Sequence, residues 1–258
     1  MYSFLHRIFA DKEGGEIFVL FSGWHFFYLA LTLAAIIIAL LLLRKKSDNA
    51  KRTTAKTFVT TAFLLYMADI FLMPFAYGQI DIEKLPFHAC TATCVLCFLS
   101  YHIGFLEKHR PSIVLLSFMS NLIYLVYPAG VMWYEIHPTS YRVIQTMLFH
   151  SIMTAYGLIV MVTEKERFKL KFFYRDLIML VCMTIWALIG NYAYSGSAEN
   201  YSHIFNWFFV VRDPFSSLPE EISKFIMPFL NILVFFAAEV VLHLIIDFAK
   251  KRSEKKKA

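Results

Sequence analysis

Charged side chains are scarce in this sequence. Only 17% of its 258 residues are Asp, Glu, Lys or Arg, whereas 59% are hydrophobic. Soluble domains are typically about 45–50% apolar, so this composition excludes an ordinary soluble protein. The apolar runs between the charges are long enough to cross a bilayer, which takes about 20 residues in a helix. We therefore expect a polytopic membrane protein.

Cysteine is also sparse, and its placement excludes a disulfide-stapled secreted protein. All four cysteines fall inside apolar runs, at positions Cys90, Cys94, Cys97 and Cys182, which is unlike a secreted disulfide framework. The first apolar run is too long for a signal peptide and follows no small-residue cleavage site, so we expect it to remain as a span. Internal repeats, which many transporters contain, are not visible.

Seven apolar runs reach the length of a membrane span. We expect all of them to be helical, because the backbone N–H and C=O groups of an open strand edge would find no hydrogen-bond partners in lipid. The predicted spans are residues 17–43, 57–77, 85–106, 111–133, 141–162, 176–194 and 222–248. The predicted fold is therefore all-α, a single seven-helix membrane domain over residues 1–258.

Basic residues are unevenly distributed over the predicted loops, and this indicates an orientation. The loop 44–56 carries six basic residues and one acidic residue, as is typical of cytoplasmic loops. Alternating sides from there puts nineteen basic residues inside and six outside. We expect an outer N-terminus and a cytoplasmic C-terminus with a basic tail at 249–258. The net charge of +6 then reflects membrane topology, and we expect no nucleic-acid partner.

The longest predicted connection, residues 195–221, is an outer loop rich in aromatic residues. Aromatic rings favour the boundary between membrane and water. Two interpretations remain open: the loop packs over the outer ends of the helices, or it forms a lid or lipid entrance.

Each predicted span places at least one polar group in its outer half. Such groups are costly in hydrocarbon and usually face a protein interior where something is bound or transformed. They are His25, Asp69, His88, Cys90, Asn121, Gln145, His150, Asn191 and Asn231. We therefore expect a polar cavity that opens toward the outer leaflet. In the inner half, Glu239 and His243 lie four residues apart, a spacing that permits a local pair.

The segment Leu85-Pro86-Phe87-His88-Ala89-Cys90 opens the third predicted span and ends on a reactive group. Cysteine is a strong nucleophile once a nearby base or cation makes it a thiolate. His150 is predicted at a comparable depth and titrates in the useful range, so a Cys90–His150 dyad is chemically sensible. Asp69 is a candidate to orient the imidazole, as the third member of a triad does.

The other cysteines of this span, a possible metal site and Arg142 are interpreted beside the dyad. Cys94 and Cys97 share a helix face with Cys90, and we assign them to packing because cysteine often behaves as a small buried hydrophobe. Structural metal sites pair two short ligand elements, and the Cys94–Cys97 pair has no second element, so we expect no metal. Arg142, at the predicted outer boundary, fits an interface anchor and a ligand of a lipid phosphate equally well.

The Leu85–Cys90 segment resembles the Leu-Pro-x-His-x-Cys opening of the bacterial YwaF-type membrane proteins. These are prokaryotic relatives of the eukaryotic transmembrane-protein-164 acyltransferases. Tyr127-Pro128, which ends the fourth predicted span, and Gln145-x-x-x-Phe149-His150 in the fifth are also similar. The resemblance covers nearly the whole chain and implies a multi-pass protein of the bacterial cell membrane.

The resemblance further implies a cysteine acyl acceptor at Cys90 and a histidine at His150, which move fatty acyl chains between phospholipids. The thiolate would attack a lipid ester, form a thioester, and pass the acyl group to a lysophospholipid or to water. Candidate donors for the oxyanion are Asn121, Asn231 and His88, with Gln145 in a supporting role. The expected partners are a phospholipid or lysophospholipid and the membrane, with no cofactor.

Other function classes remain open. The androgen-induced family of fatty-ester hydrolases is similar in architecture and uses a threonine, which makes Thr91 and Thr93 rival nucleophiles. A lipid or small-solute transporter would need the polar cavity without a nucleophile. A receptor or sensor would account for the outer aromatic loop.

Overall fold

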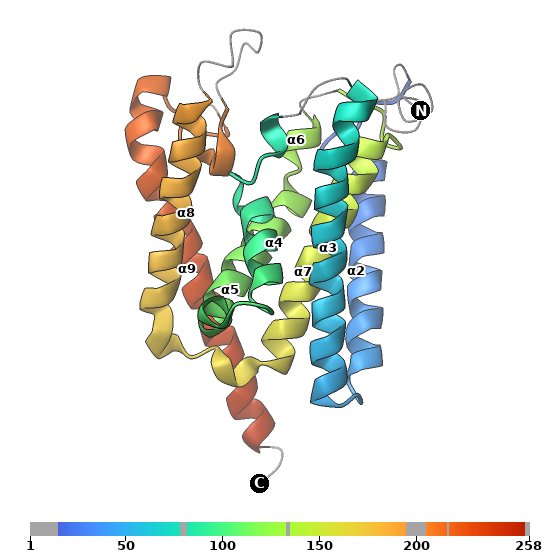
Figure 1. Ribbon diagram of the computed structural model, residues 1–258, viewed down its shortest axis with the longest axis vertical. Helices are drawn as coiled ribbons and strands as arrows, with labels where there is room; N and C mark the ends of the chain where they lie inside the picture. Colours follow the sequence, from blue (N-terminus) through green and yellow to red (C-terminus); the bar gives the residue numbers. More distant parts are fainter. Residues whose placement is uncertain (1–14, 78–81, 133–134, 195–204, 216, 256–258) are drawn as a thin grey trace. The chain divides into compact units, whose positions relative to one another are not determined.

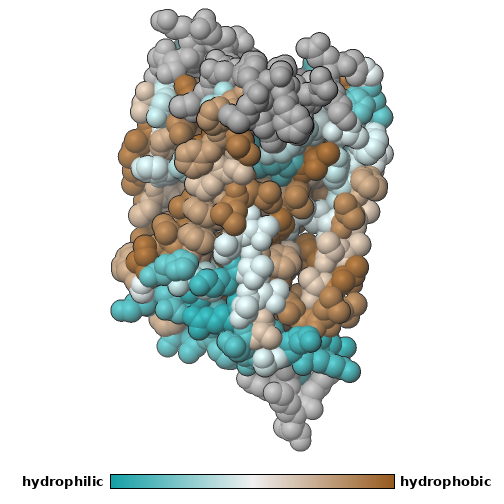
Figure 2. Space-filling model, turned by 45° about the vertical axis from the view of Figure 1, so that its right-hand side comes forward, coloured by the Kyte–Doolittle hydropathy of each residue, from teal (hydrophilic) through white to brown (hydrophobic). Residues whose placement is uncertain are grey.

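The computed structural model describes residues 15–77, 82–132, 135–194, 205–215 and 217–255, and every regular element within these ranges is a helix (Figure 1). Six of these helices are long and apolar enough to cross a membrane. The predicted all-α, polytopic membrane fold is therefore confirmed. In Figure 2 the hydrophobic residues, drawn in brown, cover the middle of the visible helices, and hydrophilic residues gather below them.

The chain divides into two compact units. Unit 1 comprises Met1–Lys84 and Ser120–Thr163, and unit 2 comprises Leu85–Met119 and Glu164–Ala258. Each unit is described by itself.

Unit 1 is built on three long helices. They are α2 (Gly23–Leu43), α3 (Asp48–Tyr77) and α7 (Tyr141–Thr163), accompanied by the short η1 (Ile82–Lys84), the end of α5 (Gly104–Val126) and α6 (Ala129–Met132). α7 packs against both α2 and α3 (Figure 1). An apolar core forms where α2 and α7 meet the segment around α6, and it contains Phe18, Leu125, Val131, Ile136, Val143 and Met147.

His25 in α2 has a structural role in unit 1. Ser22 caps the helix by accepting a hydrogen bond from the His25 backbone N–H at 3.3 Å. The ring accepts a hydrogen bond at Nδ1 from the Phe21 N–H at 3.0 Å, so its proton lies on Nε2, which donates to the Leu125 carbonyl at 2.8 Å. Both ring nitrogens are thus used to join α2 to the end of α5.

Unit 2 is built on α8 (Phe173–Ala193) and α9 (Glu220–Lys255), which pack side by side. The short η3 (Leu170–Phe172) and η5 (Trp207–Phe209) each contact both helices, and η2 (Lys165–Arg167) precedes η3. The unit also contains α4 (Ala89–Leu99) and α5 as far as Met119.

The third predicted span, residues 85–106, is wrong as a continuous helix. Its helix α4 has 11 residues and a length of about 16 Å at about 1.5 Å per residue, which is about half the hydrocarbon thickness. Pro86 disfavours a helical conformation in the residue before it, and His88 is extended, with φ −74° and ψ 142°. The described residues therefore hold six span-length helices and one short apolar helix, one span fewer than predicted.

Arg110 of α5 fixes the C-terminal end of α4. Its guanidinium is 1% exposed and donates to Ser100 through Nε at 3.0 Å and through a terminal nitrogen at 2.7 Å. A further nitrogen pairs with Glu164 at 3.3 Å, and the group lies 4.1 Å above the Tyr101 ring. A planar guanidinium offers five donors in a fixed geometry, so one side chain ties together three segments of unit 2.

Candidate functional site

Cys90 is the second residue of α4 and is 8% exposed. The first N–H groups of a helix have no acceptor within it, and the end of the helix that carries them favours negative charge. A cysteine in the first turn is therefore next to donors that suit an anion. Cys94 and Cys97 are 0% exposed on the same helix, which agrees with their assignment to packing.

The two threonines beside Cys90 are bound into the helix. The Thr91 hydroxyl donates to the His88 carbonyl at 3.1 Å, and the Thr93 hydroxyl donates to the Ala89 carbonyl at 2.6 Å. Each hydroxyl proton is thus held by a backbone acceptor, which disfavours either residue as the nucleophile.

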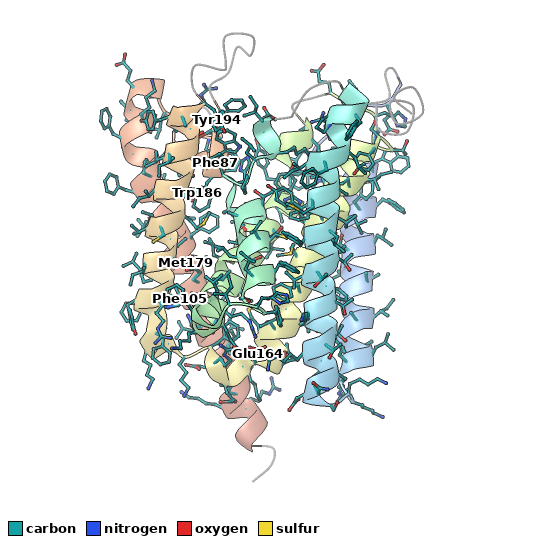
Figure 3. The ribbon with its side chains drawn as sticks, viewed as in Figure 1. Phe87, Phe105, Glu164, Met179, Trp186 and Tyr194 are labelled. Atoms are coloured by element: carbon teal, nitrogen blue, oxygen red, sulfur yellow. The ribbon has the colours of Figure 1, made fainter. Side chains whose placement is uncertain are left out.

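The residues in front of Cys90 are held by α8. The Trp186 indole N–H donates to the Pro86 carbonyl at 2.6 Å. The Phe87 ring stacks on Trp186 with centroids 5.0 Å apart and lies 5.0 Å from the Trp207 ring. Phe87 and Trp186 are labelled in Figure 3, together with Tyr194, which directly follows the end of α8. We call Phe87, Trp186 and Trp207 the aromatic clamp.

The aromatic clamp depends on a glycine in α8. A Cβ at Gly190 would lie 2.3 Å from Cγ and 2.4 Å from Cδ1 of Phe87. Phe87 can therefore lie against α8 only because position 190 has no side chain.

Residues 205–213 pack onto α8 and α9. The Asn191 side chain accepts from the Trp207 N–H at 2.9 Å and donates to the Trp207 carbonyl at 3.1 Å. The Phe208 N–H donates to His88 Nδ1 at 3.3 Å, and Asn231 donates to the Phe208 carbonyl. These contacts support the packed interpretation of this part of the predicted outer loop, whereas its residues 195–204 lie outside the described ranges.

The same loop contains strained and charged positions. Phe208 and Phe209 have left-handed φ values of 58° and 53°, which cost about 1–2 kcal/mol for a residue with a side chain. The N–H groups of Phe215, Ser217 and Leu218 donate to the Asp213 carboxylate and hold its pKa below the ordinary value. At Phe208, hydrogen bonds of the backbone N–H to His88 and of the carbonyl with Asn231 hold this conformation.

His150 lies in α7 of unit 1 and is 5% exposed. Its Nδ1 is 2.8 Å from the Thr146 carbonyl, and since a carbonyl can only accept, Nδ1 carries the proton in the neutral ring. Nε2 then carries the lone pair that a general base needs. The ring stacks on Tyr124 with centroids 3.8 Å apart and planes 16° apart, which fixes its orientation.

Asp69, the candidate to orient the His150 imidazole, pairs with a lysine, and Nδ1 of His150 is held by the Thr146 carbonyl. The Asp69 Oδ2 forms an ion pair with Lys84 at 2.8 Å, and Asp69 is 1% exposed. The Tyr66 hydroxyl of the same helix donates to the Lys84 carbonyl at 2.8 Å. Lys84 directly precedes Leu85, so α3 holds the chain just before the Leu85–Cys90 segment begins.

The remaining candidates are buried, and they divide between the units. Asn121 is 0% exposed, Gln145 accepts a hydrogen bond from Thr146 at 3.3 Å, and Arg142 is 9% exposed in the first turn of α7. These three side chains belong to unit 1 with His150, whereas Cys90 belongs to unit 2 with His88 and Asn231. The Cys90–His150 dyad therefore stays a prediction.

Comparison with known families identifies the chain. A family model described as TMEM164 family matches residues 20–247. This chain belongs to the TMEM164 family. The match includes the Leu85–Cys90 segment and His150, and it confirms the relationship to the transmembrane-protein-164 proteins. Comparisons with curated proteins and with solved structures each found no match.

The sequence did not predict that α8 holds the residues in front of Cys90 in this TMEM164-family chain. Trp186 and Gly190 lie four residues apart and so share a helix face. A large residue one turn before a small one is a signal for close packing, but the spacing does not name the partner. Phe87 is 103 positions away from Gly190 in sequence, and the structure was needed to pair them.

Proposed function

We propose that this TMEM164-family protein is a membrane-embedded cysteine acyltransferase that moves fatty acyl chains between phospholipids. The observation that carries the proposal is the position of Cys90 in the first turn of α4, directly behind a segment held by the aromatic clamp. Catalysis gains most when the reacting group is held in place beforehand. A fixed thiol at a helix N-terminus fits that requirement.

In the first half of the proposed reaction, the Cys90 thiolate attacks the carbonyl carbon of a phospholipid ester. A thioester forms, the ester C–O bond breaks, and the lysophospholipid leaves with the proton that His150 took from the thiol. The first-turn N–H groups of α4 and the His88 ring are the donors we assign to the oxyanion. Asn231 is a further candidate, since its amide has a second N–H besides the one bound to the Phe208 carbonyl.

In the second half, a lysophospholipid hydroxyl gives its proton to His150 and attacks the thioester carbonyl. The new ester forms and the Cys90 thiolate is released. Nε2 of His150 is the nitrogen we assign to both proton transfers, because Nδ1 is held by the Thr146 carbonyl. Asn121, Gln145 and Arg142 are kept as supporting candidates, with Arg142 assigned to the lipid phosphate.

The test uses the full chain in vesicles with an isotope-labelled phospholipid donor and an unlabelled lysophospholipid acceptor. We expect label to transfer to the acceptor and a hydroxylamine-sensitive acyl group to form on Cys90. Cys90→Ala should abolish both signals, and His150→Ala should slow both. Cys182→Ala, at an exposed cysteine, is the matched control and should leave both unchanged.

Other outcomes would decide against the proposal. Label released as free fatty acid with no transfer would indicate a hydrolase. Transfer that survives Cys90→Ala but not Thr93→Val would indicate a threonine nucleophile. Movement of intact phospholipid across the vesicle, with no acyl exchange, would indicate a transporter.

A further inference from the structure

A second group of ionisable side chains lies in unit 2, between α8 and α9. Asp176, Glu239 and His243 are 3%, 1% and 2% exposed. Asp176 Oδ2 and His243 Nε2 are 2.8 Å apart and join the two helices. Asp176 precedes Trp186 of the aromatic clamp by ten positions in α8, about 15 Å along the helix axis. We call these three residues the inner acidic cluster.

Glu239 is the unusual member of the inner acidic cluster. Both of its carboxylate oxygens are buried and make no hydrogen bond with any residue in the described ranges, and the same holds for His243 Nδ1. The predicted local pair between Glu239 and His243 is therefore not formed, because His243 pairs across to α8. Glu239 lies one turn before His243 on α9 and so shares the helix face that meets Asp176 of α8. Buried polar atoms without partners are rare.

The inner acidic cluster has an excess of negative charge. Its two carboxylates share one imidazole, so one negative charge remains even when His243 carries a proton. An uncompensated charge among apolar helices is strongly unfavourable. One further positive charge would remove that penalty.

Nearby basic side chains are engaged elsewhere. Lys250 of α9 donates to the Phe168 carbonyl at 3.0 Å and lies 3.7 Å from Asp247. In η3 and α8, Lys171 and Arg175 lie 5.2 Å and 4.3 Å from the Phe172 ring centroid. Among the described residues no basic side chain is hydrogen-bonded to Glu239, so a bound cation would supply the missing positive charge.

We propose that the inner acidic cluster binds one small monovalent cation, either a proton or an alkali metal ion such as Na⁺. The chemistry common to both is a single positive charge at the buried Glu239 carboxylate. In the described parts of the chain no three His, Cys, Asp or Glu residues are arranged to hold a metal ion, so an alkali ion would keep water ligands. Such water would also hydrogen-bond to Glu239 and to His243 Nδ1.

Occupancy of the cluster has a mechanical consequence for unit 2. With the cation bound, the negative charge of Glu239 is neutralised, and it no longer repels Asp176, whose pair with His243 joins α8 to α9. Without the cation, the two carboxylates repel and the helix pair is weakened. Binding to the folded state alone raises stability by mass action.

The experiment measures the thermal unfolding of the full chain in detergent by tryptophan fluorescence. NaCl is replaced by choline chloride at constant ionic strength, and each series is repeated from pH 5.5 to pH 8. We expect Tm to rise with Na⁺ or with falling pH. Glu239→Gln should abolish that dependence and should raise Tm above wild type in choline at pH 8. Glu221→Gln, at an exposed site in the first turn of the same helix, is the matched control and should keep the dependence.

The two cations are distinguished within the same data. A Tm that depends on Na⁺ at fixed pH assigns the metal ion, and a pH dependence that is equal in Na⁺ and choline assigns the proton. A wild-type Tm that responds to neither overturns the proposal, as does an unchanged response in Glu239→Gln. If Glu239→Gln does not fold, Asp176→Asn must remove the same dependence, and an unchanged response there is equally decisive. None of these readouts depends on acyl transfer.

Discussion

Gly190→Ala tests the packing that holds the residues in front of Cys90. The new Cβ would lie 2.3 Å from Phe87 Cγ, whereas ordinary van der Waals contact begins near 3.4 Å. The ring must move by about 1 Å to relieve the overlap. The ring stacks on Trp186 and lies against Trp207, so this movement disturbs the whole aromatic clamp.

The expected cost follows from two opposing effects. Overpacking of a well-filled core costs typically 1–3 kcal/mol, and a clash with a clamped ring belongs at about 3 kcal/mol. Alanine is more favourable than glycine in a helix by about 1 kcal/mol. The net loss is about 2 kcal/mol, which corresponds to a decrease in Tm of about 4–8 °C for a chain of this size.

The assay combines unfolding with the reactivity of Cys90. Purified Gly190→Ala is heated in detergent, and the rate of Cys90 alkylation by a membrane-permeant maleimide is followed below Tm. We expect a lower Tm and a changed alkylation rate. Gly104→Ala is the control because a Cβ at Gly104 meets no atom within 4 Å. Phe87→Leu in the Gly190→Ala background should restore part of the loss, since residues in contact are coupled.

One result would refute the reasoning. If Gly190→Ala unfolds at the wild-type temperature and labels at the wild-type rate, Phe87 does not pack on α8 as described. If the decrease in Tm of the double variant equals the sum of the decreases of Gly190→Ala and Phe87→Leu, the two positions are not coupled, which would also contradict a direct contact between them.

Three further predictions test other parts of unit 2. Trp186→Phe keeps an aromatic ring but removes the N–H that binds the Pro86 carbonyl and one of the two fused rings, so it should cost at least about 1 kcal/mol in thermal unfolding, and less than Trp186→Ala. Arg110→Lys leaves Ser100 without its paired donors and should lower the free energy of unfolding by about 3 kcal/mol. A stability within error of wild type would contradict the role of Arg110 in fixing the end of α4. The pKa of Asp213 is lowered from its ordinary value of 3.8, so the ionised carboxylate stabilises the loop above pH 3.8, and this contribution is lost as the pH falls through the lower pKa of the folded state. Limited proteolysis of the loop should increase at that acidic pH. Asp213→Asn should show the increase already at pH 7.

Much of the fold could be predicted from the apolar runs alone. A run of about 20 apolar residues has few alternatives to a membrane helix, and six of the seven predicted spans correspond to span-length helices. The exception was residues 85–106, where composition indicates burial but not conformation. Pro86 and the turn after Ser100 limit the helix to α4. A mean hydropathy over the whole run does not detect either helix boundary.

The candidate site was predictable in its residues but not in its contacts. The Leu85–Cys90 segment pointed to the family that the chain belongs to. Spacing along one helix suggested Glu239 as the partner of His243, yet the partner is Asp176, which lies 67 positions away. Likewise Asp69 was a reasonable orienter of His150, but Lys84 already pairs with it. Contacts between helices depend on rotation and register, which local spacing does not encode.

The fixing of α4 at both ends has a consequence for its dynamics. Isolated helices shorter than about 12 residues are marginal in water, and α4 has 11. Its N-terminal side is nevertheless tied to α8 through Pro86 and Phe87, and its C-terminal side to α5 through Arg110. Such a helix cannot fray from either end, so its amide hydrogens should exchange only when unit 2 opens as a whole. The short helix that carries Cys90 would then be among the slowest-exchanging segments of the chain.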